Sequence, residues 1–188
     1  VGKTYLIRNL FLDKKNYFFQ TSGILNARPA VQFKEFIKAI EKTFLSEQKD
    51  LKLKAPKNWM DALEQLNTAI EFVGNNKKIV LFLDEFPWMA NRKASLLQAL
   101  DYYWNRYWSQ RKNLKLIICG SAASWIIDNI LNNKGGLHNR VTKRLCIEPF
   151  TLQESAEFLR SRGVKYSHAQ ILELYMCIGG IPYYLKDV

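Results

Sequence analysis

The sequence predicts an α/β fold in which a mainly parallel sheet forms the core and a small helical lid follows it. Two largely apolar runs, Ile79–Leu83 and Leu114–Cys119, have the length and aliphatic content of strands buried on both faces. Between the expected strands, apolar residues recur at helical spacing, and this alternation indicates βαβ units. Beyond Thr151 only helices are expected, so we assign residues 1–150 to the core and 151–188 to the lid, at the start of a C-terminal region.

Composition sets limits on the class of protein. The 188 residues are enough for one large domain, and 48% of them are hydrophobic, which allows a sizeable core. No apolar run approaches the roughly 18 residues that span a bilayer, and no signal peptide is visible at the start. The net charge of +11 permits contact with nucleic acid or a partner protein, although a solvated basic surface explains it as well. Three cysteines without metal-binding spacing predict reduced core residues of a cytoplasmic protein: Cys119, Cys146 and Cys177.

The first half of the chain predicts helices and strands in alternation. Apolar residues at helical spacing favour a helix after Thr4, and an aromatic run before Ser22-Gly23 favours a short strand. Asn58 is a typical N-cap, and Gly74 ends the helix that follows it. The expected ranges are a helix over 5–11, a strand over 17–21, a helix over 31–44, a loop over 49–57, a helix over 59–72 and a strand over 79–83.

The second half begins with an unusually aromatic helix, from about Lys93 to Trp108. Its aromatic side chains either are buried between the sheet and a neighbouring element or form a stacking platform for nucleic-acid bases beside Arg106, Arg111 and Lys112. The other expected ranges are a strand over 114–119, a helix over 122–131, a loop over 132–139 with Gly135-Gly136, a last strand over 141–147, a helix to about 160 with a capping box at Thr151 and Glu154, a helix over 168–177 capped by Ser167, and a turn over 179–182.

The chain starts with a partial phosphate-binding motif. Val1-Gly2-Lys3-Thr4 matches the last four residues of Gly-x-x-x-x-Gly-Lys-[Ser/Thr], and a helix is expected directly after it. A phosphate would meet the free N–H groups at the start of that helix. Lys3 would bridge the outer phosphates, and Thr4 would offer its hydroxyl to Mg²⁺. Because the chain lacks an initiator Met and the first glycine of the motif, we expect an N-terminal truncation that removed the first strand.

Polar side chains follow the two apolar strands. Asp84 and Glu85 come directly after the first, and Ser121 follows the second. In an open α/β sheet the carboxyl ends of the strands form the ligand site. Asp84 would hold Mg²⁺, largely through its water, Glu85 would polarise the attacking water, and Ser121 would sense the γ-phosphate. A core strand that simply ends in solvated acids is the alternative.

Hydrolysis of a nucleoside triphosphate also needs positive charge for the transition state. Arg140 or Arg144 would supply it, from the chain's own site or from a neighbour's. Together with Gly2-Lys3-Thr4, Asp84 and Glu85, these arginines complete a set of candidates for phosphate binding, metal binding, water activation and transition-state charge. The combination predicts a P-loop NTPase; that its core is ASCE/AAA-like is what the family resemblance given next implies.

At this point the sequence resembles the archaeal-type P-loop ATPase family, which is related to the AAA+ and STAND groups. The resemblance covers nearly the whole chain. It implies an adenine nucleotide, ATP with Mg²⁺, and it implies that Pro182 contacts the nucleotide and that Arg140 reaches the phosphates. Members often continue into a winged-helix region and a nuclease-like domain. The matching segments are 1–4, 81–88, 118–121, 139–140, 149–150 and Gly179-Gly180-Ile181-Pro182-Tyr183-Tyr184-Leu185.

Two classes of function follow from these observations. The first is an ATP-binding domain that hydrolyses ATP with Mg²⁺ as a molecular switch. The second is a basic module that binds nucleic acid or a partner protein and carries a vestigial nucleotide site. Asp84 and Glu85 favour the first, because a module for nucleic acid has no reason to place two acids at a strand end beside a phosphate loop.

Overall fold

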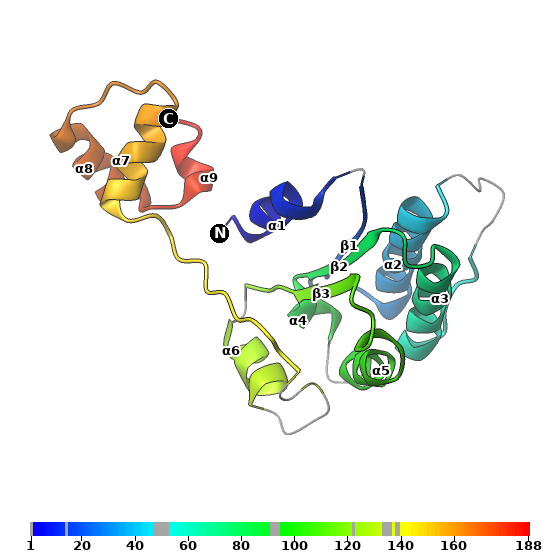
Figure 1. The fold of residues 1–188 in the computed structure, drawn as a ribbon. Coiled ribbons are helices and arrows are strands. Elements are labelled where there is room, and N and C mark those ends of the chain that lie inside the picture. The colour runs from blue at the N-terminus through cyan, green and yellow to red at the C-terminus, as the bar shows by residue number, and fades with distance from the viewer. Residues whose placement is uncertain are drawn as a thin grey trace. The chain divides into compact units, whose positions relative to one another are not determined.

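The computed structural model describes residues 2–13, 15–46, 53–90, 95–121, 123–132, 137 and 140–188 (Figure 1). The chain forms two compact units, one of Leu10–Thr142 and one of Val1–Asn9 with Lys143–Val188. Several sequence expectations fall outside the described residues. They are the loop at 49–52, the helix start at Lys93, the residue Ala122, the Gly135-Gly136 loop and Asn139.

A three-stranded parallel sheet organises the larger unit, as the sequence predicts. The central strand is β2, so its carboxyl end has a neighbouring strand end on each side. The register places Ser22 opposite Asp84. In sheet order, the strands are β1 (Asn16–Ser22), β2 (Lys78–Asp84) and β3 (Leu114–Ile118).

Helices connect the strands of this unit and cover the sheet. α2 packs on β1 and on α3, and α3 packs on α5. As predicted, the Asn58 side chain caps α3, accepting a hydrogen bond from the Asp61 N–H at 2.9 Å. The helices are α2 (Pro29–Phe44), α3 (Trp59–Phe72), α4 (Phe86–Met89), α5 (Leu96–Tyr103) with its π-helical continuation η1 (Trp104–Trp108), and α6 (Ala123–Ile126) with its π-helical continuation η2 (Ile127–Leu131).

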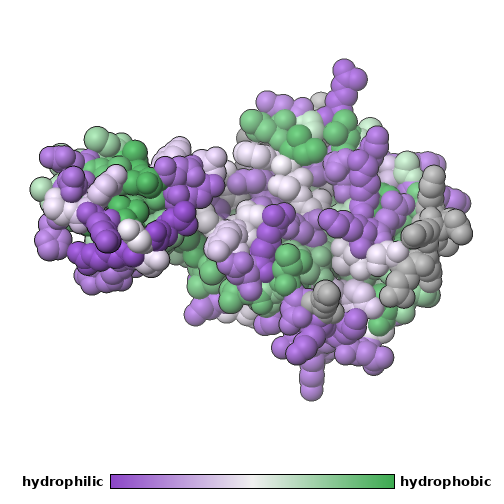
Figure 2. All heavy atoms as spheres, turned by 90° about the horizontal axis from the view of Figure 1, so that it is seen from above, coloured by the Kyte–Doolittle hydropathy of each residue, from purple (hydrophilic) through white to green (hydrophobic). Residues whose placement is uncertain are grey.

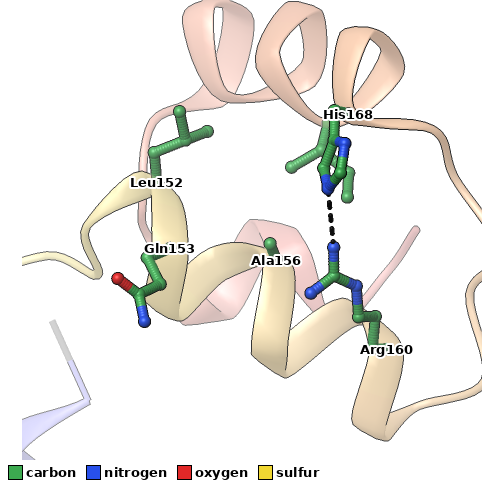
Figure 3. A pocket seen from close by; sticks show the side chains of 6 residues that line it. Leu152, Gln153, Ala156, Arg160 and His168 are labelled. Atoms are coloured by element: carbon green, nitrogen blue, oxygen red, sulfur yellow. Dashed lines mark hydrogen bonds between the residues drawn. The ribbon is translucent and has the colours of Figure 1, made fainter.

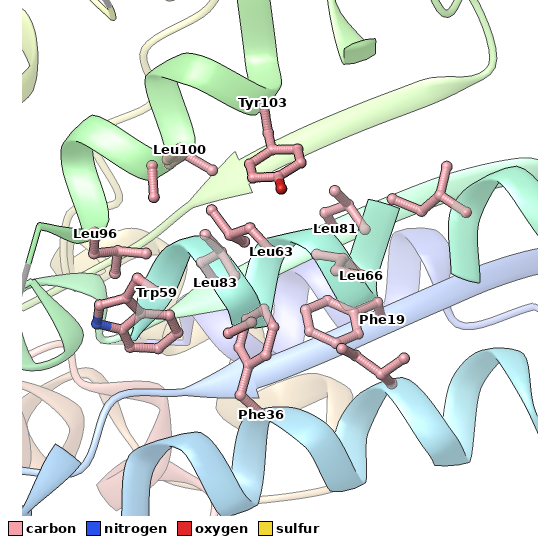
Figure 4. Packing of buried hydrophobic residues seen from close by; sticks show 14 of the residues in the cluster. Phe19, Phe36, Trp59, Leu63, Leu66, Leu81, Leu83, Leu96, Leu100 and Tyr103 are labelled. Carbon is pink, nitrogen blue, oxygen red and sulfur yellow. The ribbon is translucent and has the colours of Figure 1, made fainter. Parts of the chain in front are cut away.

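The core lies between the sheet and α2, α3 and α5 (Figure 4). Phe19 of β1 and Trp59 of α3 both pack edge-to-face on Phe36, each with ring centroids 5.3 Å apart. Trp108 is buried, and its indole N–H donates to the Asn67 side-chain oxygen at 2.8 Å. Each fully buried large side chain stabilises the fold by about 1.5–3 kcal/mol. This packing fixes β2 in the centre of the unit.

The segment 141–147 corrects the sequence prediction, because it is not a strand. Its backbone forms no ladder with any described strand. Its apolar side chains stay exposed, 65% in the case of Leu145 and 44% in that of Val141. Strand propensity depends on packing against a paired strand, and this segment is paired with none of the described strands.

The smaller unit is helical after Thr151. Thr151 and Glu154 form the predicted capping box at the start of α7, and Ser167 caps α8 in the same way with Gln170. A small apolar core joins the three helices through Leu159, Ile171 and Leu185. Its helices are α7 (Leu152–Ser161), α8 (His168–Ile178) and α9 (Pro182–Leu185).

The cysteines fit the prediction of core residues only in part. Cys119 is buried at the end of β3, whereas Cys146 and Cys177 are exposed. The prediction is therefore wrong for these two. Cys146 lies within the unpaired segment 141–147, and its thiol donates to Glu148 at 2.9 Å. That hydrogen bond and the charge of Glu148 raise the pKa of Cys146.

Hydrophilic side chains cover much of the surface seen in Figure 2, with hydrophobic patches between them. Some of the exposed apolar side chains are large, such as Met176 of α8 and Tyr183 of α9, which are 79% and 63% exposed. Among the described helices, none is both long and apolar enough to cross a membrane.

Candidate functional site

Asp84 ends the central strand as a buried carboxylate. The residue is buried, with 6% of its surface exposed. One carboxylate oxygen accepts the Glu85 N–H at 3.1 Å, and the backbone carbonyl accepts the Gly23 N–H at 2.8 Å. Burial of an acid at the end of a strand is costly unless polar groups compensate it. Asp84 therefore differs from a solvated acid that merely ends a core strand.

Glu85 has a left-handed backbone, with φ 44° and ψ 45°. For a residue other than glycine this conformation costs about 1–3 kcal/mol, and such strain gathers at functional sites. The following residues hold it in place, because the Phe86 N–H donates to the Cys119 carbonyl at 2.8 Å and the Trp88 N–H donates to the Glu85 carbonyl at 3.0 Å. The chain turns sharply at Glu85 and enters α4.

Ser121 holds the Glu85 side chain. The Ser121 N–H and hydroxyl both donate to the same carboxylate oxygen of Glu85, at 3.0 and 2.8 Å. Hydrogen bonds to a carboxylate are stronger than those between neutral groups. The structure thus brings together three residues that the sequence predicted for one site, Asp84, Glu85 and Ser121.

Two glycines that the sequence analysis did not assign to the site let three chain segments approach here. A Cβ on Gly23 would lie 2.2 Å from the Glu85 carbonyl oxygen, and one on Gly120 would lie 2.6 Å from the Pro87 ring. Neither distance is compatible with a side chain. A usable sequence signal is that each glycine lies close behind the end of a strand. Gly23 directly follows β1, and Gly120 comes two residues after the end of β3, just before Ser121.

Gln32 is a third residue that the sequence did not assign to the site. Its side chain is buried and accepts the Ile24 N–H at 2.9 Å while donating to the Ser22 carbonyl at 3.1 Å. These two hydrogen bonds tie the loop after β1 to α2. The loop contains Gly23, so Gln32 helps to hold the segment beside Asp84. A polar residue in the apolar stripe of α2 was the available signal.

The residues of the phosphate-binding motif lie at the start of α1 (Lys3–Phe11). Gly2 has φ +73°, which glycine adopts without strain, and its carbonyl accepts the Leu6 N–H at 2.9 Å. Lys3 and Thr4 form the first helical turn and are half-buried. They belong to the unit that contains the lid helices, and the Asp84 group belongs to the other unit.

The remaining predicted residues are spread over both units. Arg140 belongs to the larger unit and Arg144 to the smaller one, and both side chains are exposed. Pro182 begins α9. Just before it, the chain packs closely against Phe150, whose N–H donates to the Gly180 carbonyl at 2.7 Å. A Cβ on Gly180 would lie only 1.7 Å from the Phe150 carbonyl oxygen. Gly180 thus fixes the turn that leads to Pro182.

A shallow pocket in the lid contains none of the predicted site residues (Figure 3). Leu152, Ala156 and Ile171 give it apolar walls, and the Arg160 guanidinium approaches a His168 ring nitrogen at 3.2 Å. The group of Asp84, Glu85 and Ser121 therefore remains the candidate site of the larger unit.

The sequence matches an ATPase family, and the structure is similar to that of a solved Walker-type ATPase. The family described as an ATPase domain predominantly from Archaea matches residues 1–188. An uncharacterized protein of Methanocaldococcus jannaschii, MJECL04, is 30% identical over 112 residues, which make up 60% of this chain and 24% of that protein. The Walker-type ATPase PABY2304 of Pyrococcus abyssi has a similar fold, with a TM-score of 0.64 and 20% identity, over 98% of this chain and 57% of that one.

The matches therefore span about a quarter of MJECL04 and somewhat more than half of the Pyrococcus protein. The parallel α/β fold predicted from the sequence is confirmed, and it is the fold of a Walker-type ATPase. The resemblance noted in the sequence is confirmed as well. Because the family match extends over all 188 residues, the chain belongs to the family of P-loop ATPase domains found predominantly in Archaea.

Proposed function

We propose that this domain binds ATP together with Mg²⁺ and hydrolyses the nucleotide as a molecular switch. The observation that carries the proposal is the arrangement at the end of β2. Buried Asp84 precedes Glu85, and Ser121 of the neighbouring strand end holds the Glu85 carboxylate. In P-loop NTPases, an acid at a strand end and the Lys-Thr pair of the phosphate loop serve one metal–nucleotide complex. The family supports assigning the same division of roles here.

The available donor atoms fit the metal. The Asp84 carboxylate and the Thr4 hydroxyl are hard oxygen ligands, which Mg²⁺ prefers, and nucleotide-bound Mg²⁺ commonly takes only one or two protein groups. When bound, the ion neutralises charge on the phosphates. Lys3 and the free N–H groups of the first turn of α1 bind the phosphates in this proposal. The order of the motifs along the chain and the family support assigning these residues to one nucleotide site.

Glu85 orients and polarises the attacking water in this proposal, and Ser121 positions Glu85. Arg140 or Arg144 supplies positive charge to the phosphates, and Pro182 contacts the adenine side of the nucleotide. The same proposal includes an AAA-like subclass, a domain boundary at residue 150 and a cytoplasmic location.

The test is calorimetric titration of the full-length protein with Mg-ATP, paired with a phosphate-release assay. Lys3→Ala is expected to abolish binding, because the outer phosphates lose their cation. Glu85→Gln is expected to keep ATP binding while hydrolysis falls by about a hundredfold or more, since the general base is lost. Lys34→Ala, which removes an exposed lysine of α2, is the control and should bind as the wild type does. Unchanged affinity in Lys3→Ala would refute the proposed site.

A second candidate function is a basic module that binds nucleic acid or a partner protein and whose nucleotide site is vestigial. The net charge of +11 favours it. Failure of the wild-type protein to bind Mg-ATP, together with salt-sensitive binding of a polyanion, would select this alternative.

A further inference from the structure

Positive side chains gather at the amino-terminal ends of the three strands, at the edge of the sheet opposite to Asp84. All three strands are parallel, so their amino ends lie at one edge. The register pairs Asn16 with Lys78 and Val80 with Lys115, and the Asn113 carbonyl accepts the Ile79 N–H at 2.8 Å. Segments far apart in sequence thus bring their cations to one edge. These residues, which we call the basic rim, are Lys15, Lys77, Lys78, Arg111, Lys112 and Lys115.

The basic rim is exposed, and few acidic residues lie near it in the sequence. Its five lysines are exposed, and Arg111 is half-buried with its guanidinium donating to the Asn75 side chain at 3.0 Å. The ion pairs found among the described residues, Lys38–Glu35 and Lys186–Asp187, do not involve it. The segments 73–78 and 106–115 contain no Asp or Glu. The acid nearest in sequence to Lys15 is Asp13, whose carboxylate accepts the Lys15 N–H at 3.0 Å.

An exposed aromatic surface precedes the rim in the chain. Tyr102 and Tyr107 are 43% and 38% exposed, and the Arg106 guanidinium lies 6.0 and 5.8 Å from their ring centroids. Arg111, the first rim residue that follows this surface along the chain, comes five residues after Arg106. Tyr107 lies within the π-helical η1, a type of turn that is frequent at functional sites. The sequence left open whether these aromatic residues are buried or form a platform, and part of each of these two rings is exposed.

Cationic side chains beside exposed aromatic rings suit one class of ligand in particular. Single-stranded nucleic acids place phosphates on cations and stack bases on aromatic rings. A duplex would engage the cations without the rings, and an acidic protein would offer no bases to stack. We propose that the basic rim, with Tyr102 and Tyr107, binds single-stranded nucleic acid. This inference goes beyond the ATPase function and does not rest on it.

The experiment measures fluorescence anisotropy of a labelled oligothymidine of about 30 nucleotides against the full-length protein over a salt series, without nucleotide. The rim variant Lys77→Gln/Lys112→Gln/Lys115→Gln removes three cations. For single strands the logarithmic salt slope is about 0.7 per phosphate contact, so the slope should flatten by about 2 and the affinity at moderate salt should fall about tenfold or more. The control Lys34→Gln/Lys54→Gln/Lys57→Gln has the same change of charge on exposed lysines outside the rim and should bind as the wild type does.

A second variant separates base stacking from charge alone. Tyr102→Ala/Tyr107→Ala should weaken oligothymidine binding by about five- to a hundredfold and leave binding of heparin, a polyanion without bases, unchanged. Equal weakening by the rim and control variants would overturn the proposal, because binding would then follow total charge. If the tyrosine variant loses heparin binding and oligothymidine binding to the same extent, the proposal that bases stack on these rings is overturned. Lys3→Ala should bind the oligonucleotide as the wild type does. The oligonucleotide result can therefore be interpreted even if the proposed ATP site is wrong.

Discussion

The hydroxyl and the backbone N–H of Ser121 both donate to one carboxylate oxygen of Glu85, at 2.8 and 3.0 Å. This contact links the residues that follow two neighbouring parallel strands, β2 and β3. It fixes the Glu85 side chain while the Glu85 backbone occupies a left-handed conformation. In the proposed mechanism Glu85 orients the attacking water, so Ser121 acts as a positioning residue for that group.

Replacing Ser121 tests this relationship. Ser121→Ala removes the hydroxyl bond and keeps the backbone bond, and a hydrogen bond to a charged group is worth about 1.5–3 kcal/mol. We expect kcat for ATP hydrolysis to fall about tenfold with KM little changed, because nucleotide binding does not involve this bond. Ser121→Thr, which retains a hydroxyl, should recover most of the rate. An effect on KM alone would instead assign Ser121 to nucleotide binding.

Gly23→Ala is expected to destabilise the larger unit by about 1–3 kcal/mol, the usual cost of overpacking. The added Cβ would meet the Glu85 carbonyl oxygen at 2.2 Å, and a backbone atom moves less easily than a side chain. Gly74→Ala is the control, because a Cβ there meets open space and introduces only the strain of φ +67°, about 1 kcal/mol. Urea unfolding of the two variants measures the difference. A smaller loss at Gly23 than at Gly74 would show that the segments at the site are not tightly packed.

Thr151→Ala is expected to loosen α7 by about 1 kcal/mol, the usual value of an N-cap. The variant removes the hydroxyl that accepts the Glu154 N–H at 3.2 Å. Hydrogen exchange of the α7 amides should accelerate about fivefold, because local opening follows local stability. Gln153→Ala, at an exposed position of the same helix, should change exchange much less. Equal acceleration throughout the larger unit would argue against a local effect.

Tyr103 makes stability depend on alkaline pH. Burial, followed by the negative charge of Glu64, raises the pKa of Tyr103 to about 12 from 10.0. A group whose pKa is raised in the folded state contributes stability that is complete below its unfolded pKa and is lost as pH rises through the folded value. Between about pH 10 and 12, the wild type should therefore lose stability that Tyr103→Phe does not lose. Urea unfolding at pH values below and within this window measures the difference, and parallel losses in both proteins would contradict it.

Local sequence patterns were enough for most elements of the fold. The apolar run before Asp84 predicted β2, the Asn58 cap predicted the start of α3, and the Thr151 and Glu154 pair predicted the start of α7. These signals succeed because capping and burial on both faces depend on residues close in sequence. The segment 141–147 failed as a strand because alternation and β-propensity say nothing about whether a neighbouring strand is present.

The sequence by itself determined the α/β class, the central strand and the order of the residues proposed for the nucleotide. Only the tertiary structure decided that Ser121 holds Glu85, that Gly23 must lack a side chain, and that lysines from three segments meet at one edge of the sheet. The physical reason is that helical and strand periodicity acts over a few residues. Register and close approach depend on contacts between residues distant in sequence, such as Ser121 and Glu85, which no local pattern encodes.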